Sequence, residues 1–360
     1  MQNVNYHLVL IIDGNWLLRS RSYIFEKKFK KSQPEAIKRA AGEELKDTMA
    51  RSILKILYKF PISNMILIQD CGSWRKLIQK PTSQQNIEYK GNRHLQDDID
   101  WDFIFKVFDE FVEGFHDNGI TICKQYLMEG DDWCWKWSRY LNSHNENALI
   151  WSSDRDLQQL VQQDGNCLTA WYNDKKGIVM TKIGEPTDLV EMFMQPIINC
   201  PVKPILERVR PIQYINPDSV VIEKVLCGDA GDNIKPVVSY QKNGRIYKFS
   251  PTDLKKMLGT IHIETISDLE THHNDIAQYI TENKKFKPYN FSNKDICENL
   301  EYNTKEVWLN EKYIPEDIAN KVSCDIIYKQ ANIDEIKQNY KLMFSKPDSN
   351  IKDIFAGAIY

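Results

Sequence analysis

The feature that most constrains the fold is a set of short, nearly continuous apolar runs that each end in an aspartate. Residues 7–12 (HLVLII) lead directly into Asp13, and residues 65–69 (MILIQ) lead into Asp70. An apolar run of this length predicts a strand that is buried on both faces of its sheet. Because open α/β sheets bind ligands at the carboxyl ends of their strands, both aspartates are expected at a ligand-binding edge.

The remainder of the N-terminal half alternates strand and helix patterns. Such alternation is typical of an α/β domain with a mostly parallel central sheet flanked by helices. Two further apolar runs and a later hairpin complete the predicted sheet. Strands are expected at 120–125 and 148–153, a β-hairpin at 167–181, and helices at 36–58, 102–118 and 157–163.

Two acidic clusters follow the third and fourth predicted strands. Glu129, Asp131 and Asp132 open a predicted helix, and Asp154 and Asp156 follow the strand at 148–153. Nearby carboxylates repel one another unless cations neutralise them, so a divalent metal site is the first hypothesis. The alternative is structural, since acidic residues also cap helices and complement the helix dipole.

A third acidic pair, Asp229 and Asp232, follows a helix expected at 220–226. Mg²⁺ prefers oxygen ligands and suits an acidic site without His or Cys. Two such ions can activate water and stabilise the leaving oxygen in phosphodiester hydrolysis. The predicted ligands are Asp13, Asp70, Glu129, Asp131, Asp132, Asp154, Asp156, Asp229 and Asp232.

The length and composition indicate an ordinary globular protein. With 360 residues, 42% hydrophobic and 27% charged, the chain can bury a full core. Prolines become frequent near 185–215, so we expect a catalytic domain at 1–200 and a smaller, mainly helical domain at 201–360. The eight cysteines contain no Cys-x-x-Cys pair, so neither a zinc site nor a disulfide framework is indicated. No apolar stretch approaches a membrane span, and a soluble, cytoplasmic protein is expected.

Positive charge is concentrated in two segments, although the net charge is −3. Residues 19–39 and 235–256 are both rich in Lys and Arg, which is expected where metals and phosphates meet. Solvated surface charge is the alternative for either segment. Between the sheet strands, residues 71–101 form a long polar connection of the kind that serves as a lid or a binding element. Predicted nucleic-acid contacts are Arg19, Arg21, Lys27, Lys28, Arg75, Lys76, Lys235, Lys242, Arg245 and Lys248.

The order of these motifs resembles the 5′ nuclease superfamily, which includes flap endonucleases and phage 5′→3′ exonucleases. Six blocks carry the resemblance over about 220 residues, and residues 313–319 further resemble the T-even phage ribonuclease H branch. The blocks are Ile12-Asp13-Gly14-Asn15, Gln69-Asp70, Tyr89-Lys90-Gly91-Asn92-Arg93, Glu129-Gly130-Asp131-Asp132, Ser153-Asp154-Arg155-Asp156, and the run from Gly228 through Asp229 and Asp232 to Ile234.

The resemblance implies specific roles for these residues. The acidic side chains up to Asp132 correspond to a first metal cluster, and those from Asp154 on correspond to a second. Lys90 and Arg93 match basic residues at the base of a helical arch, here about 71–101, that contact the scissile phosphate. Together with Asp13 and Asp154 they form the predicted catalytic set.

One departure concerns duplex binding. The family has a glycine-rich helix-hairpin-helix after the last aspartates, often with a potassium ion, but this chain reads KPVVSY at 235–240. The paired glycines are missing, so duplex contact is expected to depend on the Lys and Arg of 235–256.

The resemblance also implies an activity and its partners. It indicates a metal-dependent 5′→3′ exonuclease and flap endonuclease that removes RNA primers, with two Mg²⁺ ions that Mn²⁺ can replace. The substrates would be branched or 5′-ended DNA and RNA/DNA duplex. A monomer from a phage-infected bacterium is expected, with a sliding clamp or a single-strand-binding protein as partner. The apolar tail 354–360 is the candidate clamp contact.

Three alternatives stay open at this point. A haloacid-dehalogenase-like phosphatase would share the first strand, but its chemistry needs an aspartate where this chain has Asn15. A ribonuclease of the related PIN fold would use a smaller acidic set without the arch. An inactive nucleic-acid-binding scaffold would lose some carboxylates, and all the matching ones are present here.

Overall fold

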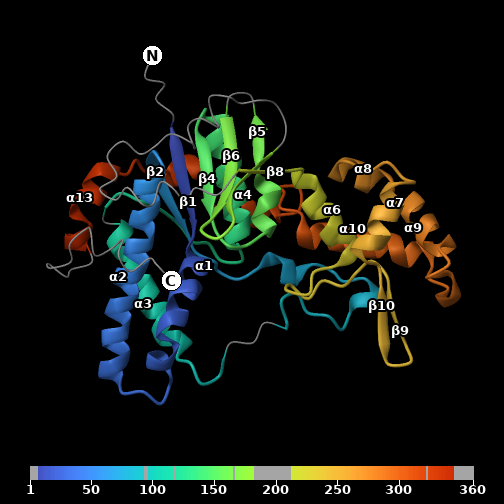
Figure 1. The fold of residues 1–360 in the computed structure, drawn as a ribbon, viewed down its shortest axis with the longest axis horizontal. Coiled ribbons are helices and arrows are strands. Elements are labelled where there is room, and N and C mark those ends of the chain that lie inside the picture. Colours follow the sequence, from blue (N-terminus) through green and yellow to red (C-terminus); the bar gives the residue numbers. More distant parts are fainter. Residues whose placement is uncertain are drawn as a thin grey trace. The chain divides into compact units, whose positions relative to one another are not determined.

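The structure of the chain is a computed structural model, which describes residues 7–92, 96–116, 118–164, 167–181, 212–321 and 323–343. The chain forms two compact units (Figure 1). The first, which we call the sheet unit, comprises residues 1–72, 95–214 and 316–360. The second, the helical unit, comprises residues 73–94 and 215–315.

The sheet unit is built on a single sheet. Its strands are β1 (Leu8–Asp13), β2 (Ile62–Ile68), β3 (Thr121–Cys123), β4 (Asn147–Trp151), β5 (Gln162–Asp164), β6 (Cys167–Asn173), β7 (Gly177–Thr181) and β8 (Gln213–Ile215). They form an eight-stranded sheet in the order β3-β2-β1-β4-β6-β7-β8, with β5 paired to β6. Strands β1, β2, β3, β4 and β6 are parallel, whereas β5 and β7 run antiparallel to β6. The mostly parallel sheet and the hairpin predicted from the sequence are both confirmed.

Helices cover both faces of this sheet. They are α1 (Gly14–Ser22), α2 (Glu35–Lys59), α3 (Trp101–His116), α4 (Gly130–Ser143), α11 (Glu316–Ala319), α12 (Cys324–Ile327) and α13 (Ile333–Met343), with the 3-10 helices η1 (Tyr23–Phe29) and η4 (Asp156–Leu160). None of the helices in the described ranges is long and apolar enough to cross a bilayer.

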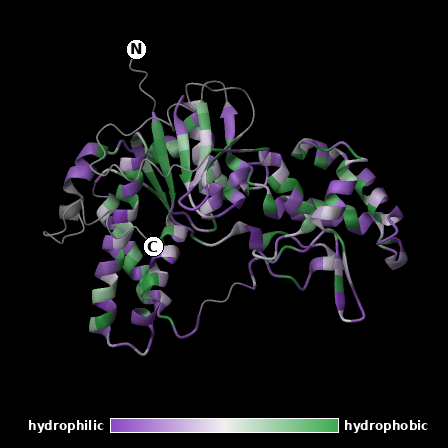
Figure 2. Ribbon diagram, viewed as in Figure 1, coloured by the Kyte–Doolittle hydropathy of each residue, from purple (hydrophilic) through white to green (hydrophobic). Residues whose placement is uncertain are grey.

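The alternation of side chains along β1 explains the two layers. Leu8, Leu10 and Ile12 belong to a core that also contains residues of α1, α2, α3 and α13. Val9 and Ile11 point to the other face, where α4 contacts β1, β4 and β6. Every residue from Leu8 to Ile12 is fully buried, which explains why the strand has no polar residues at alternating positions. Figure 2 colours the central strands as hydrophobic.

The helical unit has its own core. Its elements are η2 (Trp74–Leu77), η3 (Thr82–Gln84), α6 (Pro217–Cys227), β9 (Ser239–Lys242), β10 (Arg245–Lys248), α7 (Pro251–Leu258), α8 (Ile266–Thr271), α9 (His273–Glu282), η6 (Lys287–Tyr289) and α10 (Asn293–Val307). Apolar residues of α6, α7, α9 and α10 pack together, and Tyr89 joins them. The buried amide of Gln84 donates to Asn299 at 3.1 Å and Asn303 at 3.3 Å. These bonds fix the segment 73–94 on α10.

Three details differ from the sequence expectations. Residues 157–163 are not an α-helix, because η4 ends at Leu160 and the chain continues into β5. The described residues of 71–101 form 3-10 helices and turns rather than a helical arch until α3 begins, consistent with their lack of apolar periodicity. Residues 73–94 belong to the helical unit and residues 316–360 to the sheet unit, so neither unit is continuous in sequence. The expected boundary near residue 200 lies outside the described residues.

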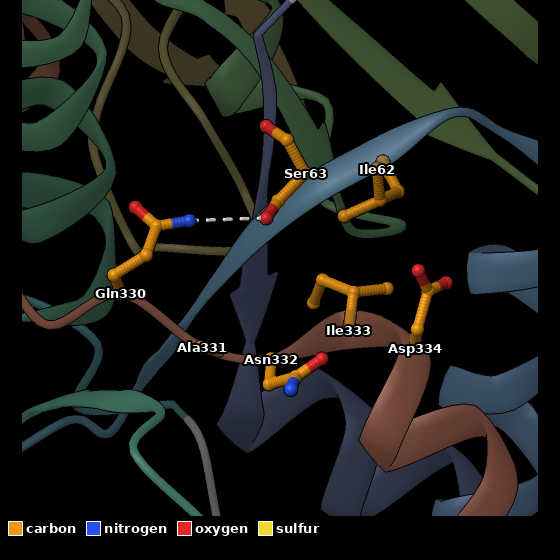
Figure 3. A pocket seen from close by; sticks show the side chains of 7 residues that line it. All are labelled: Ile62, Ser63, Gln330, Ala331, Asn332, Ile333 and Asp334. Atoms are coloured by element: carbon orange, nitrogen blue, oxygen red, sulfur yellow. Dashed lines mark hydrogen bonds between the residues drawn. The ribbon is translucent and has the colours of Figure 1, made fainter.

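The segment after α12 returns to the amino-terminal end of β2. The buried Asn64 donates to the Lys329 carbonyl at 2.9 Å and accepts from the Ala331 amide at 3.0 Å. Next to this junction, residues 62–63 and 330–334 line an open pocket (Figure 3). The pocket lies at the end of β2 opposite to Asp70, so it is separate from the acidic edge.

We predict that Asn64→Ala lowers the free energy of unfolding by about 2 kcal/mol, because it removes the partner of the Ala331 amide and one of the two side-chain donors to the Lys329 carbonyl. Urea denaturation followed by circular dichroism measures this loss. The control is Gln330→Ala, an exposed residue of the same segment, for which a change below about 0.5 kcal/mol is expected. Equal losses for the two variants would contradict this role of Asn64.

Candidate active site

Three predicted ligands follow parallel strands that end at the same edge of the sheet. Asp13 is the last residue of β1 and lies in register with Ile68 of β2, while Ile12 is in register with Trp151 of β4. Asp70 and Asp154 come two and three residues after their strands. The strand order turns at β1, with β2 and β3 on one side and β4 and β6 on the other. This is the position at which open α/β sheets form ligand sites.

Asp13 is held by two donors. The Ser152 hydroxyl donates to Asp13 Oδ2 at 2.6 Å, and the Trp16 amide donates to Oδ1 at 2.9 Å. Burial raises the pKa of Asp13 to about 7, the charges of Asp70 and Asp154 add to the rise, and the two hydrogen bonds oppose it. Asp13 therefore caps α1, as the structural alternative predicts, and also lies in the field of two other carboxylates.

Asp70 is exposed and is bound from two elements. Asn15 donates its side-chain amide to Asp70 Oδ2 at 2.7 Å, and the Gly130 amide at the start of α4 donates to Oδ1. A Cβ at position 130 would lie 2.7 Å from that same oxygen. Only glycine therefore lets the Asp70 carboxylate reach the positive end of the helix dipole at α4 without a shift.

The Asp154 turn is organised by the same serine that holds Asp13. The Asp154 amide donates to Ser152 Oγ at 3.0 Å, and the Asp156 amide donates to Asp154 Oδ1 at 2.9 Å. Ser152 is fully buried. Its hydroxyl thus connects the ends of β1 and β4.

The acidic start of α4 has a structural role. Glu129 and Asp132 form a capping box, in which the Glu129 amide donates to Asp132 Oδ2 at 3.3 Å. Both side chains are buried, as expected for capping groups, whereas Asp131 is partly exposed. The capping alternative therefore applies to Glu129 and Asp132, and Asp131 is the more accessible carboxylate of this cluster.

The donor chemistry of this edge fits a divalent cation. The raised pKa of Asp13 is due first to burial and then to the charges of Asp70 and Asp154, and a bound cation would oppose both effects. Within the described ranges, no three His, Cys, Asp or Glu side chains are arranged to hold a metal ion by themselves. Mg²⁺ does not need such a cage, because it keeps several waters and is bound through one or two carboxylates plus substrate phosphate.

The helical unit holds Asp229 and Asp232 in a tight loop. Asp229 and Ile234 exchange backbone hydrogen bonds of 2.9 and 2.8 Å, and the Gly231 amide donates to Asp229 Oδ1 at 2.7 Å. Burial opposes ionisation of Asp229, but the ion pair with Lys224 outweighs it and lowers the pKa of Asp229. The loop is therefore preformed, with one of its carboxylates held in the ionised state.

Lys90 lies against this loop. Its amide donates to the Asp232 carbonyl at 2.8 Å, its ammonium is 3.9 Å from Asp232 Oδ2, and the Tyr89 hydroxyl donates to the same oxygen at 3.3 Å. Lys90 has a positive φ of 54°, so this part of the chain is a turn and not a helix. Arg93 lies outside the described residues.

The predicted nucleic-acid contacts divide by exposure. Arg75 is buried, donates to the Glu306 carbonyl at 3.0 Å and lies 4.6 Å from the Trp74 ring centroid. It is therefore a structural residue, and its prediction as a nucleic-acid contact is wrong. Arg21 is partly buried, with Ser52 at 2.8 Å and Asp174 at 3.7 Å. The exposed members are Arg19, Lys27, Lys28, Lys76, Lys235, Lys242, Arg245 and Lys248.

Known proteins resemble this chain in both sequence and fold. No family model matches the chain. A curated relative, the 5′-3′ exonuclease of Mycoplasmopsis pulmonis, is 25% identical over 237 residues, which are 65% of this chain and 63% of the relative. The matched region thus spans less than two thirds of that relative. Two solved structures share the fold at 15% identity and cover 94% of this chain and all of theirs: the T5 D15 protein co-crystallised with metal ions, with a TM-score of 0.53, and the T5 5′-exonuclease with bound zinc, with a TM-score of 0.51.

The chain is therefore similar in sequence to a 5′-3′ exonuclease and shares the fold of the T5 5′-exonuclease. The sequence match and the shared fold both agree with the motif order found in the sequence. In this chain the first seven predicted ligands all lie in the sheet unit, and Asp229 and Asp232 lie in the helical unit with Lys90.

Two residues that position the acidic edge of the sheet were not predicted. Asn15 lies within the first motif and Ser152 just before the fifth, but neither carries charge. Only their position in the sequence could have indicated this role, since each is a small polar side chain just after a buried strand. Only the pairing of β1 with β4 brings Ser152 to Asp13.

We predict that Gly228→Ala destabilises the helical unit by about 3 kcal/mol. Gly228 has φ 74° and ψ 173°, a region open almost only to glycine, and a Cβ would lie 2.5 Å from the Pro236 nitrogen. Gly244→Ala is the matched control, because Gly244 has the same φ of 74° and no atom within 4 Å of such a Cβ. Urea denaturation should show a loss of only about 1 kcal/mol for the control; equal losses would contradict the steric argument.

Proposed function

We propose that this protein is a metal-dependent, structure-selective 5′→3′ exonuclease and flap endonuclease that hydrolyses phosphodiesters at 5′ ends. The observation that carries the proposal is the approach of Asp13, Asp70 and Asp154 at the carboxyl edge of a parallel sheet. The name of the Mycoplasmopsis pulmonis relative and the metal ions of the T5 structures support it.

The carboxylates are the proposed metal ligands. Following the family pattern, the first ion would be held by Asp13, Asp70 and the acidic start of α4, with Asp131 its most accessible member. The second would be held by Asp154, Asp156, Asp229 and Asp232. Mg²⁺ is the preferred ion in this proposal, and Mn²⁺ can replace it. When bound, such ions supply an activated water and stabilise the departing oxygen.

The chain's own residues orient these ligands and hold the substrate. Ser152 fixes Asp13 relative to Asp154, and Asn15 fixes Asp70. Hydrogen bonds of this kind keep ligands in the productive orientation. Exposed cations such as Lys27 and Lys28 on η1 would contact the phosphate backbone without reading its sequence.

Several finer features belong to this proposal. Removal of RNA primers rests on the resemblance of residues 313–319 to the T-even branch, and so does the suggestion of a phage protein in the bacterial cytoplasm. A sliding clamp and a single-strand-binding protein are proposed partners of a monomeric enzyme. The tail 354–360, the proposed clamp contact, lies outside the described residues.

Asp154→Asn should abolish cleavage of a 5′-labelled flap substrate, because it removes the charge that would hold a metal ion, while binding of the flap stays within about threefold. Gel assays with about 5 mM MgCl₂ follow the fraction of substrate cleaved over several minutes. The wild-type protein in excess EDTA should also be inactive. The matched control is Asp102→Asn, an exposed residue at the start of α3 in the same unit, which should cut like wild type.

Two results would overturn the metal assignment. One is undiminished cutting by the Asp154→Asn variant, and the other is cutting by wild type in excess EDTA. Cleavage of neither DNA nor RNA/DNA substrates by the wild type with Mg²⁺ or Mn²⁺ would favour the inactive scaffold instead.

A double change of Lys90 and Arg93 to Ala should slow the bond-breaking step at least about tenfold more than it weakens duplex affinity. Lys90 borders the Asp232 loop, where a cation would meet the scissile phosphate. Single-turnover kinetics at saturating enzyme separate the two effects. The control is Lys294→Ala, an exposed lysine of the same unit that is not among the predicted nucleic-acid contacts. If the double variant only loses duplex affinity and cleaves bound substrate at the wild-type rate, Lys90 and Arg93 have no role in the bond-breaking step.

A further inference from the structure

Strands β9 and β10 form a β-hairpin at residues 239–248, close to the point where the sequence lacks the paired glycines of the family's duplex-binding element. Strands β9 and β10 pair only with each other and form a separate two-stranded sheet. Asn243 and Gly244 connect them with φ values of 49° and 74°, the pattern of a tight type I′ turn. In Figure 1 the hairpin extends away from the helices of its own unit.

The base of the hairpin is anchored on one face. Tyr240 lies directly opposite Tyr247, and the two rings stack at 5.0 Å. Tyr240 also stacks on Tyr289 at 3.3 Å and donates its hydroxyl to the Lys285 carbonyl at 3.3 Å. The hairpin is therefore a fixed projection of the helical unit.

The tip of the hairpin carries an unfavourable arrangement of charge. Lys242 is paired directly across the strands with Arg245, so both cations project from the same face. Like charges directly opposite one another destabilise a strand pair. No Asp or Glu occurs between 235 and 252, and none of the described acidic side chains forms an ion pair with Lys242, Arg245 or Lys248.

The opposite face of the hairpin is also exposed. It presents Lys248, Gln241 and Ile246, and Ile246 is 73% exposed. A two-stranded hairpin without a covered face is only marginally stable in water. Cations on both faces of a narrow ribbon match a partner that offers negative charge on two sides.

We propose that the β9–β10 hairpin is a ribbon that inserts into a groove of double-stranded nucleic acid. Lys242 and Arg245 contact the phosphates of one groove wall, Lys248 those of the other, and Ile246 packs against the sugars. A two-stranded ribbon fits the major groove, which is about 12 Å wide. The identity of the polyanion as nucleic acid rests on the function proposed above.

The composition of the hairpin favours a nucleic acid over a protein partner. Protein interfaces have an apolar centre that is poor in lysine, whereas this tip offers Ile246 as its exposed aliphatic side chain among three cations. Contacts to phosphate carry no sequence information. The hairpin is thus expected to bind duplexes of any sequence.

The test is the salt dependence of duplex binding. Lys242→Ala/Arg245→Ala should weaken binding of a fluorescent 20-base-pair duplex at least about tenfold at 100 mM NaCl. It should lower the slope of log K against log [salt] by about two, one for each lost phosphate contact. Anisotropy titrations in EDTA measure both quantities without cleavage. Binding of a single strand of the same length should change less than threefold.

Lys284→Ala/Lys294→Ala is the matched control, since it removes the same charge from exposed positions of the same unit that lie outside 235–256. An equal loss of affinity in this control, an unchanged slope in the hairpin variant, or an equal loss on single strands would overturn the inference. Unchanged circular dichroism and unfolding midpoints exclude misfolding, and Ile246→Ala provides a second hairpin variant that should weaken duplex binding without altering the slope.

The two proposals fail separately. A wild-type protein that binds duplex through the hairpin but cuts no substrate would overturn the nuclease function and leave the inference standing. An active enzyme whose hairpin variant binds like wild type would overturn only the inference.

Discussion

Repulsion between carboxylates at one sheet edge is the constraint on which the rest of this structure depends. Parallel pairing of β1 with β2 and β4 brings Asp13, Asp70 and Asp154 to the same side. The chain places a neutral or dipolar donor on each of them: Ser152 on Asp13, Asn15 with the first amide of α4 on Asp70, and the Asp156 amide on Asp154. Burial and the neighbouring carboxylates raise the pKa of Asp13 in spite of its two donors, so the donors orient this side chain without offsetting its environment.

The helical unit stabilises its carboxylates differently. Asp229 is paired with Lys224, and Asp232 accepts a hydrogen bond from Tyr89 with Lys90 close by. Lysine ammonium groups therefore compensate the carboxylates of this loop, whereas neutral hydrogen-bond donors stabilise the carboxylates of the sheet unit. Gly228 makes this loop possible, because its backbone conformation and its contact with Pro236 leave no room for a side chain.

The sequence predicted the parts of this site that depend on local pattern. Buried strands followed by Asp13 and Asp70 could be read directly, because a continuous apolar run and its position before a turn are local properties. The burial of Arg75 could not be read, since it depends on the Glu306 carbonyl more than 200 residues away. The same holds for Ser152, whose role exists only once β4 pairs with β1. Residues 71–92 carried no periodicity, and their 3-10 turns are set by packing on α10.

The central claim is that the carboxyl edge of the sheet binds divalent cations. Anomalous diffraction from a crystal of the full chain grown with Mn²⁺ tests it most directly. The account predicts an ion bonded to carboxylate oxygens of Asp13 and Asp70, with Ser152 and Asn15 still holding those side chains. An ordered edge without an anomalous peak at saturating Mn²⁺, or ions bound only elsewhere on the protein, would contradict it.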